Sequence, residues 1–102
     1  MHRLILQKKA SSCLKYLFVK DKTMHNYIIN SLKDLQDRWT KSDNIKNIWE
    51  WIYRKREWRW RILFTIDNDE INIWIIEQEK DTKKDYNKRK RYILEIIKIL
   101  NK

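Results

Sequence analysis

Two apolar segments, Trp60–Ile66 and Ile71–Gln78, lie next to each other in the second half of the chain. The polar residues Asp67–Glu70 separate them, and Asn and Asp adopt turn conformations readily. The chain contains no glycine, so this is its best turn signal, and it predicts an antiparallel hairpin. Because both segments carry apolar residues on both faces, we expect central strands that are covered on both sides.

The first part of the chain predicts a short strand and then two helices. Residues Arg3–Gln7 alternate weakly, as a strand does. Apolar residues then recur at spacings of three and four, which is typical of one helix face. A second such stripe follows a polar link, in which Asp21 or Thr23 can cap the helix. The two stripes predict a helical hairpin that covers one sheet face. They comprise Ala10, Cys13, Leu14, Leu17 and Phe18, then Met24, Tyr27, Ile28, Leu32, Leu35 and Trp39.

The remaining segments predict one more strand and a terminal helix. After a polar loop, residues Ile45–Arg56 alternate in side-chain character and are interpreted as a single strand. Thr82 and Asp85 have the spacing of a capping box, which marks the start of a helix. Apolar residues then recur on one helix face as far as about Leu100.

The expected order is therefore β-α-α-β-β-β-α, which belongs to the α+β class. A helical hairpin packs on a small antiparallel sheet of three strands, which the first strand joins at one edge, and a helix ends the chain. A chain of 102 residues predicts one domain, spanning 1–102. No apolar run has the length of a membrane-spanning helix, so we expect no membrane contact. The single cysteine, Cys13, cannot form an internal disulfide, which predicts a reducing, cytoplasmic location.

Charge adds a candidate partner. The formal net charge is +10, and an excess of this size attracts polyanions such as nucleic acids or the ribosome. Four arginines lie at the start of the central hairpin: Arg54, Arg56, Arg59 and Arg61. Residues two apart on a strand share a face, so paired strands would bring these four together. Arginine binds phosphate with two parallel hydrogen bonds, and a solvated arginine face is the simpler alternative.

Aromatic residues are interspersed with these cations, and unpaired bases stack on aromatic rings. These aromatic residues are Trp49, Trp51, Tyr53, Trp58 and Trp60. For at least half of them, packing in the core or at the sheet edge is the alternative. The sequence contains no recognisable nucleophile triad, glycine-rich loop or metal-ligand cluster, so we expect neither a metal nor a cofactor. Charge stabilisation by Arg and Lys with a tyrosine suffices for metal-free RNA cleavage, in which a 2′-hydroxyl attacks the adjacent phosphate.

Several short motifs together resemble the RelE/ParE superfamily of type II toxins. The resemblance extends from Arg3 to the last helix and is most specific over residues 53–86. Its motifs are Tyr53-Arg54-Lys55-Arg56, Trp60-Arg61-Ile62-Leu63-Phe64, Ile66-Asp67, the Ile-rich strand that follows, Lys80 and Tyr86. It implies a small toxin encoded beside an antitoxin. RelE-like members cut mRNA in the ribosomal A site, and ParE-like members inhibit DNA gyrase.

The resemblance also implies roles for individual residues. Arg54 and Arg56 match two basic residues of the strand before the hairpin, and Arg61 matches the arginine that stabilises the phosphate. Lys80 lies where an arginine is thought to assist the leaving group, and Tyr86 matches the tyrosine that activates or orients the 2′-hydroxyl. Arginine stays protonated and is a poor general base, so that role shifts to Tyr86. Further RNA-binding cations are expected at Lys55, Arg59, Lys83 and Lys84.

Two functional classes remain open at this stage. The first is a metal-free, ribosome-dependent mRNA endonuclease toxin, whose partners are a cognate antitoxin, mRNA and the ribosome. The second is a binder without chemistry, either a ParE-like inhibitor of DNA gyrase or an inactive member that only holds its antitoxin. An acidic or amphipathic antitoxin segment would complement the basic face in either case.

Overall fold

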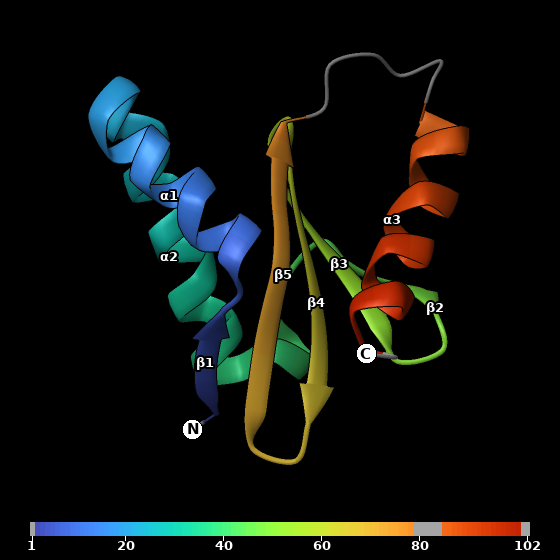
Figure 1. Cartoon of the computed structure of the whole chain (residues 1–102). Coiled ribbons are helices and arrows are strands. Elements are labelled where there is room, and N and C mark those ends of the chain that lie inside the picture. Colours follow the sequence, from blue (N-terminus) through green and yellow to red (C-terminus); the bar gives the residue numbers. More distant parts are fainter. Residues whose placement is uncertain (1, 79–84, 101–102) are drawn as a thin grey trace.

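The computed structural model describes residues 2–78 and 85–100, and in the last helix it describes the side chains of residues 90, 91 and 93–98. A five-stranded sheet lies between a helical hairpin and the C-terminal helix (Figure 1). The elements are β1 (Arg3–Leu6), α1 (Lys8–Lys20), α2 (Lys22–Arg38), a short 3-10 helix η1 (Trp39–Lys41), β2 (Ile45–Trp49), β3 (Ile52–Glu57), β4 (Trp60–Asp67), β5 (Glu70–Gln78) and α3 (Asp85–Leu100). None of the helices within these ranges is long and apolar enough to cross a membrane.

The strand order in the sheet is β1-β5-β4-β3-β2. β1 runs parallel to β5, and the other neighbouring strands are antiparallel. The predicted central hairpin is confirmed as β4 and β5, which pair from Trp60 opposite Gln78 to Asp67 opposite Glu70. The α+β class, the helical hairpin, the first strand at one edge and the terminal helix are confirmed as well.

The prediction of a single strand over Ile45–Arg56 is wrong. The segment folds back on itself as β2 and β3, with Trp49 opposite Ile52. The turn residue Glu50 has a φ of 41°, a left-handed conformation that carries no sequence signal in a glutamate. The Asn47 side chain supports this turn, because its amide donates to the Glu50 carbonyl at 2.5 Å and to the Ile52 carbonyl at 3.3 Å.

Three hairpin turns share one backbone feature. Each has two residues between its strands, and the first of these has a positive φ: Glu50, Trp58 at 60° and Asn68 at 54°. Glycine or asparagine normally occupies this position. Asn68 therefore fits it, whereas a residue as bulky as Trp58 is strained there by about 1–3 kcal/mol.

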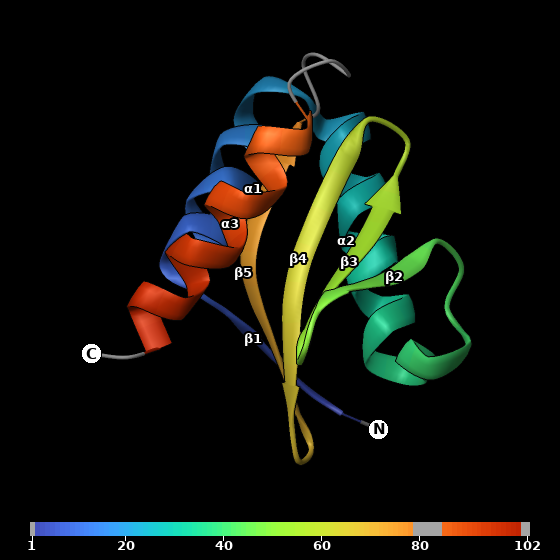
Figure 2. The same cartoon turned by 90° about the vertical axis from the view of Figure 1, so that its right-hand side faces the viewer.

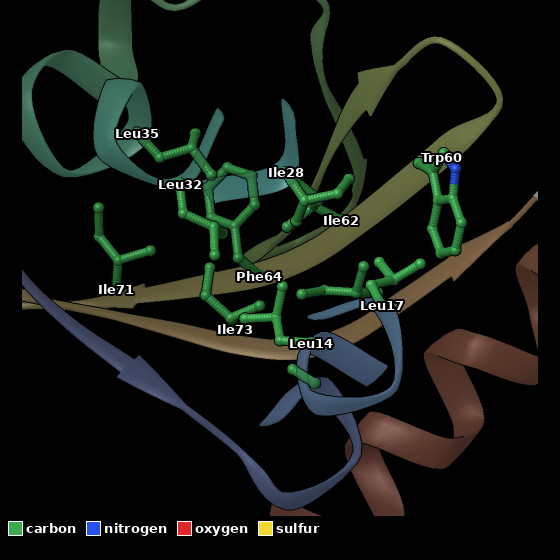
Figure 3. Close-up of a cluster of buried hydrophobic side chains, with 12 residues drawn as sticks. Leu14, Leu17, Ile28, Leu32, Leu35, Trp60, Ile62, Phe64, Ile71 and Ile73 are labelled. Atoms are coloured by element: carbon green, nitrogen blue, oxygen red, sulfur yellow. The ribbon is translucent and has the colours of Figure 1, made fainter. Parts of the chain in front are cut away.

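The larger core lies between the helical hairpin and the sheet (Figure 3). Phe64 is fully buried at its centre, with Ile28 and Leu35 of α2 and Ile73 of β5. Asp21 caps α2, as predicted, by accepting a hydrogen bond from the Met24 amide at 3.1 Å. The predicted stripes therefore face the sheet, with two exceptions: Phe18 and Tyr27 are exposed.

A smaller core lies on the other face of the sheet, under α3 (Figure 2). Ile96 of α3 is fully buried there against a set of sheet residues, Ile48, Ile52, Leu63, Trp74 and Ile75. An irregularity in the β4–β5 pairing, between Leu63 and Phe64, puts the consecutive residues Trp74 and Ile75 in the same cluster and returns Ile76 to the larger core. Because of this bulge, regular alternation of faces along β5 does not continue beyond Ile73.

Candidate nucleic-acid interface

Three of the predicted arginines lie on the sheet face that α3 covers. Arg56 in β3 is directly opposite Arg61 in β4, and Arg54 is opposite Leu63. Leu63 belongs to the cluster under α3, so the register assigns all three arginines to that side. Directly opposed residues of an antiparallel pair have Cβ atoms only about 4.5–5.5 Å apart. The fold thus brings Arg54, Arg56 and Arg61 together, as the sequence predicted.

These arginines lie toward the end of the sheet where the β3–β4 turn is located. Two like charges placed directly opposite each other on a sheet face destabilise it. β5 adds Glu77 on the other side of Arg61, so a row of charged residues, Arg56, Arg61 and Glu77, crosses three strands. We call this set, together with Arg54, the arginine row. It offers fixed donors for a phosphate beside one carboxylate.

Accessibility differs along the arginine row. Arg56 is exposed, Arg54 is partly buried, and Arg61 is only 6% exposed. The Nε atoms of Arg54 and Arg61 are shielded from solvent. Arg56 Nε donates to the backbone carbonyl of Trp58 at 3.3 Å, which ties the row to the β3–β4 turn. An anion approaching from solvent therefore meets Arg56 first.

The prediction that paired strands bring all four arginines together is wrong for Arg59. Arg59 is exposed, but it lies in the turn between β3 and β4 and so shares no strand face with Arg61. The predicted strands end at Arg56 and begin again at Trp60, so the turn itself was predicted, but the spacing argument wrongly treated Arg59 as part of a strand. Arg59 adds positive charge at the sheet end without belonging to the arginine row.

Lys55 occupies the opposite face of the sheet. The residue is 3% exposed, and its Nζ donates to the Ser42 hydroxyl at 2.7 Å and to the Asp43 carbonyl at 3.0 Å. The Asp34 carboxylate of α2 lies 3.6 Å from the same Nζ. Hydrogen bonds from Ser42 and Arg38, with the charge of Lys55, hold the pKa of Asp34 below its usual value. This position does not favour the RNA contact predicted for Lys55, and it gives the residue a structural role.

Several other predicted site residues, or their side chains, lie outside the part of the chain that the structure describes. Lys80, Lys83 and Lys84 lie outside the described residues, and so does the predicted capping residue Thr82. Tyr86 belongs to the first turn of α3, and its side chain lies outside the described ones. Among the side chains that are described, no three His, Cys, Asp or Glu residues gather where they could hold a metal ion.

The aromatic residues divide between core and surface. Trp60 is buried in the larger core, and Tyr53 packs between Trp39 and Phe64 with ring centroids 5.3 and 5.7 Å away. Trp49 and Trp51 contact each other edge-on at the β2–β3 turn, at the far end of β3 from the arginine row. Trp58 is 77% exposed beside Arg59.

Cys13 is half-buried on α1, as its place on the apolar stripe predicted. Burial, with a smaller contribution from the charge of Glu77, raises the pKa of its thiol. Because the thiolate is the reactive form, this environment suits a packing residue rather than a nucleophile.

Solved structures of bacterial toxin–antitoxin proteins have a similar fold. The YoeB dimer from Staphylococcus aureus aligns with a TM-score of 0.63 at 20% identity, over 78% of this chain and 98% of that one. A heterotetrameric YoeB–YefM toxin–antitoxin complex from the same organism aligns at 0.62 and 20% identity, over 78% and 99%. A chromosomal ParDE TA system from P. aeruginosa aligns at 0.61 and 19% identity, over 78% and 98%.

No protein-family model and no curated protein sequence matches the chain. The likeness is therefore one of three-dimensional structure. The chain has the fold of the RelE/ParE toxins.

Proposed function

We propose that this chain is the toxin of a type II toxin–antitoxin pair and that it acts as a metal-free, ribosome-dependent mRNA endonuclease in the cytoplasm. The toxin fold supports the first part of this proposal. The arginine row carries the second part, because two arginines held directly opposite each other on a rigid sheet favour binding of a phosphate. The expected partners are an antitoxin, mRNA and the ribosome.

The proposed reaction needs three roles. The 2′-hydroxyl of one nucleotide attacks the adjacent phosphorus, and the bond to the 5′-oxygen of the next nucleotide breaks. Arg61 and Arg56 stabilise the charge that develops on the equatorial oxygens. Glu77, which strand register sets beside Arg61, is the described carboxylate best placed to accept the hydroxyl proton. Tyr86 then orients the 2′-hydroxyl, and Lys80 assists the leaving group, as the resemblance implies.

The antitoxin is proposed to cover this basic region. A chain with a net charge of +10 is best complemented by an acidic or amphipathic segment. YefM and ParD occur with toxins of this fold in the solved complexes. The proposal predicts that antitoxin binding and RNA binding compete for the arginine row.

One observation favours a second candidate function, a binder without chemistry such as a gyrase inhibitor. Arg61 is 6% exposed, so a phosphate reaches it only if neighbouring side chains move. A protein that inhibits a target by surface contact needs no such access. ParDE is also among the structural neighbours.

Induced expression separates the two functions. Wild-type protein is compared with Arg61→Ala, Glu77→Gln and Tyr86→Phe, and reporter mRNA is mapped by primer extension with and without a translation inhibitor. A nuclease gives growth arrest with cuts that need translation, and Arg61→Ala loses both. Growth arrest without cuts supports the binder, and a gyrase supercoiling assay then tests that target. Absence of growth arrest at confirmed expression contradicts both.

A further inference from the structure

The β3–β4 turn carries an aromatic surface that neither the fold nor the arginine row requires. Trp58 is 77% exposed and has a φ of 60°, a strained conformation for a bulky side chain. Strain of this kind persists where the surrounding structure holds it, and such sites are often functional. An exposed tryptophan at this position contributes little core packing, so stability alone does not account for it.

Tyr27 of α2 holds the Trp58 ring in place. The two ring centroids are 6.1 Å apart and their planes are inclined by 27°, which is a stacked arrangement. Tyr27 is itself 51% exposed, although it was predicted to be part of the buried stripe. A tryptophan that is stacked on one side and open to solvent on the other offers a preformed surface for a flat ring.

A hollow of about 130 Å³ lies beside these rings, lined by Met24, Tyr27, Glu57 and Trp58. The Glu57 carboxylate accepts a hydrogen bond from the Ser31 hydroxyl at 2.6 Å, which fixes its position. A carboxylate still has capacity for further donors. The hollow therefore combines a stacking surface with an oriented acceptor.

The turn also connects this surface to the arginine row. Arg56 Nε donates to the Trp58 carbonyl at 3.3 Å, and Arg59 is the other residue of the turn. The Trp58 ring stacks toward the helical hairpin, whereas Arg56 lies on the α3 side. An RNA strand that crosses this end of the sheet would meet cations on one side and the aromatic surface on the other.

From this arrangement we infer that Trp58, Tyr27 and Glu57 bind one unpaired base of an RNA strand that crosses the β3–β4 turn and whose phosphate the arginine row holds on the other side. This inference rests on the proposed nuclease function and adds a base-contacting site to it. Glu57 selects the base, because adenine, cytosine and guanine present amino donors to a carboxylate. Uracil instead presents one N–H between two carbonyl oxygens, which the carboxylate repels. The site therefore favours a base that carries an amino group.

The test measures binding of the full-length chain to short, single-stranded 2′-O-methyl RNA, which lacks the attacking hydroxyl and is not cut. The oligonucleotides differ at one position, which is A, C, G, U or abasic, and fluorescence anisotropy is read at one fixed salt concentration. Trp58→Ala lowers affinity about tenfold and removes the difference from the abasic strand. Trp58→Phe restores affinity to within about threefold of wild type. Glu57→Gln reduces the discrimination against U.

Trp51→Ala is the matched control, because Trp51 is an exposed tryptophan in the equivalent two-residue turn at the other end of β3. It keeps wild-type affinity. Equal losses in the two tryptophan variants, or an abasic strand that binds as tightly as the others, overturn the inference.

The reporter-mRNA assay distinguishes failure of the base site from failure of the nuclease proposal. Cuts in both wild type and Trp58→Ala at the same sites leave the nuclease standing and the base site refuted. Trp58-dependent binding without any cuts supports the base site and refutes the nuclease.

Discussion

Lys55 and Arg56 are adjacent in sequence and carry the same charge, yet they lie on opposite faces of β3 in very different surroundings. Lys55 is 3% exposed among the Ser42 hydroxyl, the Asp43 carbonyl and the Asp34 carboxylate. Arg56 is exposed, directly opposite another arginine. A cation surrounded by acceptors stabilises a fold, whereas cations that oppose each other favour an external anion. Charge counts alone do not separate these roles, but strand register does.

The two faces also differ in how much core they hold. The core under the helical hairpin brings together buried residues of α1, α2, β4 and β5, whereas among the described side chains of α3 the other core contains Ile96 and Ile93. Loss of the first should unfold the whole protein. Loss of the second should release α3 and leave the rest folded.

The largest expected effect is that of Phe64→Ala, at the centre of the larger core. Removing a fully buried phenylalanine side chain lowers the free energy of unfolding by about 3–5 kcal/mol, through lost burial and the cavity left behind. Urea denaturation monitored by circular dichroism measures this. An unchanged midpoint would mean that the hairpin face is not the main core.

Ile96→Ala should have a more local effect. The substitution removes the fully buried anchor of α3 and weakens its docking by about 2–4 kcal/mol. Amide hydrogen exchange measures this effect. We expect faster exchange in α3, while the amides of β4 and β5 remain protected. Leu94→Ala is the matched control, because Leu94 is on the same helix and exposed. Uniform loss of protection across the sheet would contradict the distinction between the two cores.

Sequence patterns predicted the apolar helical stripes, the Asp67–Glu70 turn and the arginines that come together, because helix periodicity and asparagine carry strong local signals. They placed a turn between Arg56 and Trp60, which is confirmed, but they missed the β2–β3 turn at Glu50, since tertiary pairing imposes a positive φ there on a residue with no preference for it. These turns set the strand register, and the register determines on which face of the sheet each side chain lies. The burial of Lys55 and the position of Arg59 in a turn therefore follow from long-range pairing, which residue spacing does not reveal.

The ion pair of Lys55 with Asp34 should make the free energy of unfolding depend on pH. The pKa of Asp34 is lowered in the folded protein, so the carboxylate stabilises the fold above the ordinary aspartate pKa of about 3.9. That stabilisation is lost as the pH falls through the lower, folded-state pKa. Unfolding free energies measured from neutral to acidic pH should fall more steeply for wild type than for Asp34→Asn. Parallel curves would show that Asp34 does not couple to folding.

The smallest expected effect concerns the ion pair between Lys9 of α1 and Glu95 of α3, which joins the two helices at the surface. Lys9 is mostly exposed, so solvent screens the pair and Lys9→Ala should lower the free energy of unfolding by less than about 1 kcal/mol. Lys8→Ala, an exposed neighbour, controls for the change in net charge. A larger loss for Lys9→Ala, insensitive to added salt, would indicate that α3 depends on this pair more than on Ile96.

The most direct test of the account measures mRNA cleavage in a purified translation system, with Arg61→Ala beside Lys55→Met. Both variants lose one positive charge, and urea denaturation establishes a temperature at which both are folded. We expect Arg61→Ala to cut at least about 100-fold more slowly than wild type, because a charge-stabilising donor is lost, and Lys55→Met to cut at nearly the wild-type rate. Equal losses in the two variants, or full activity in Arg61→Ala, would contradict it.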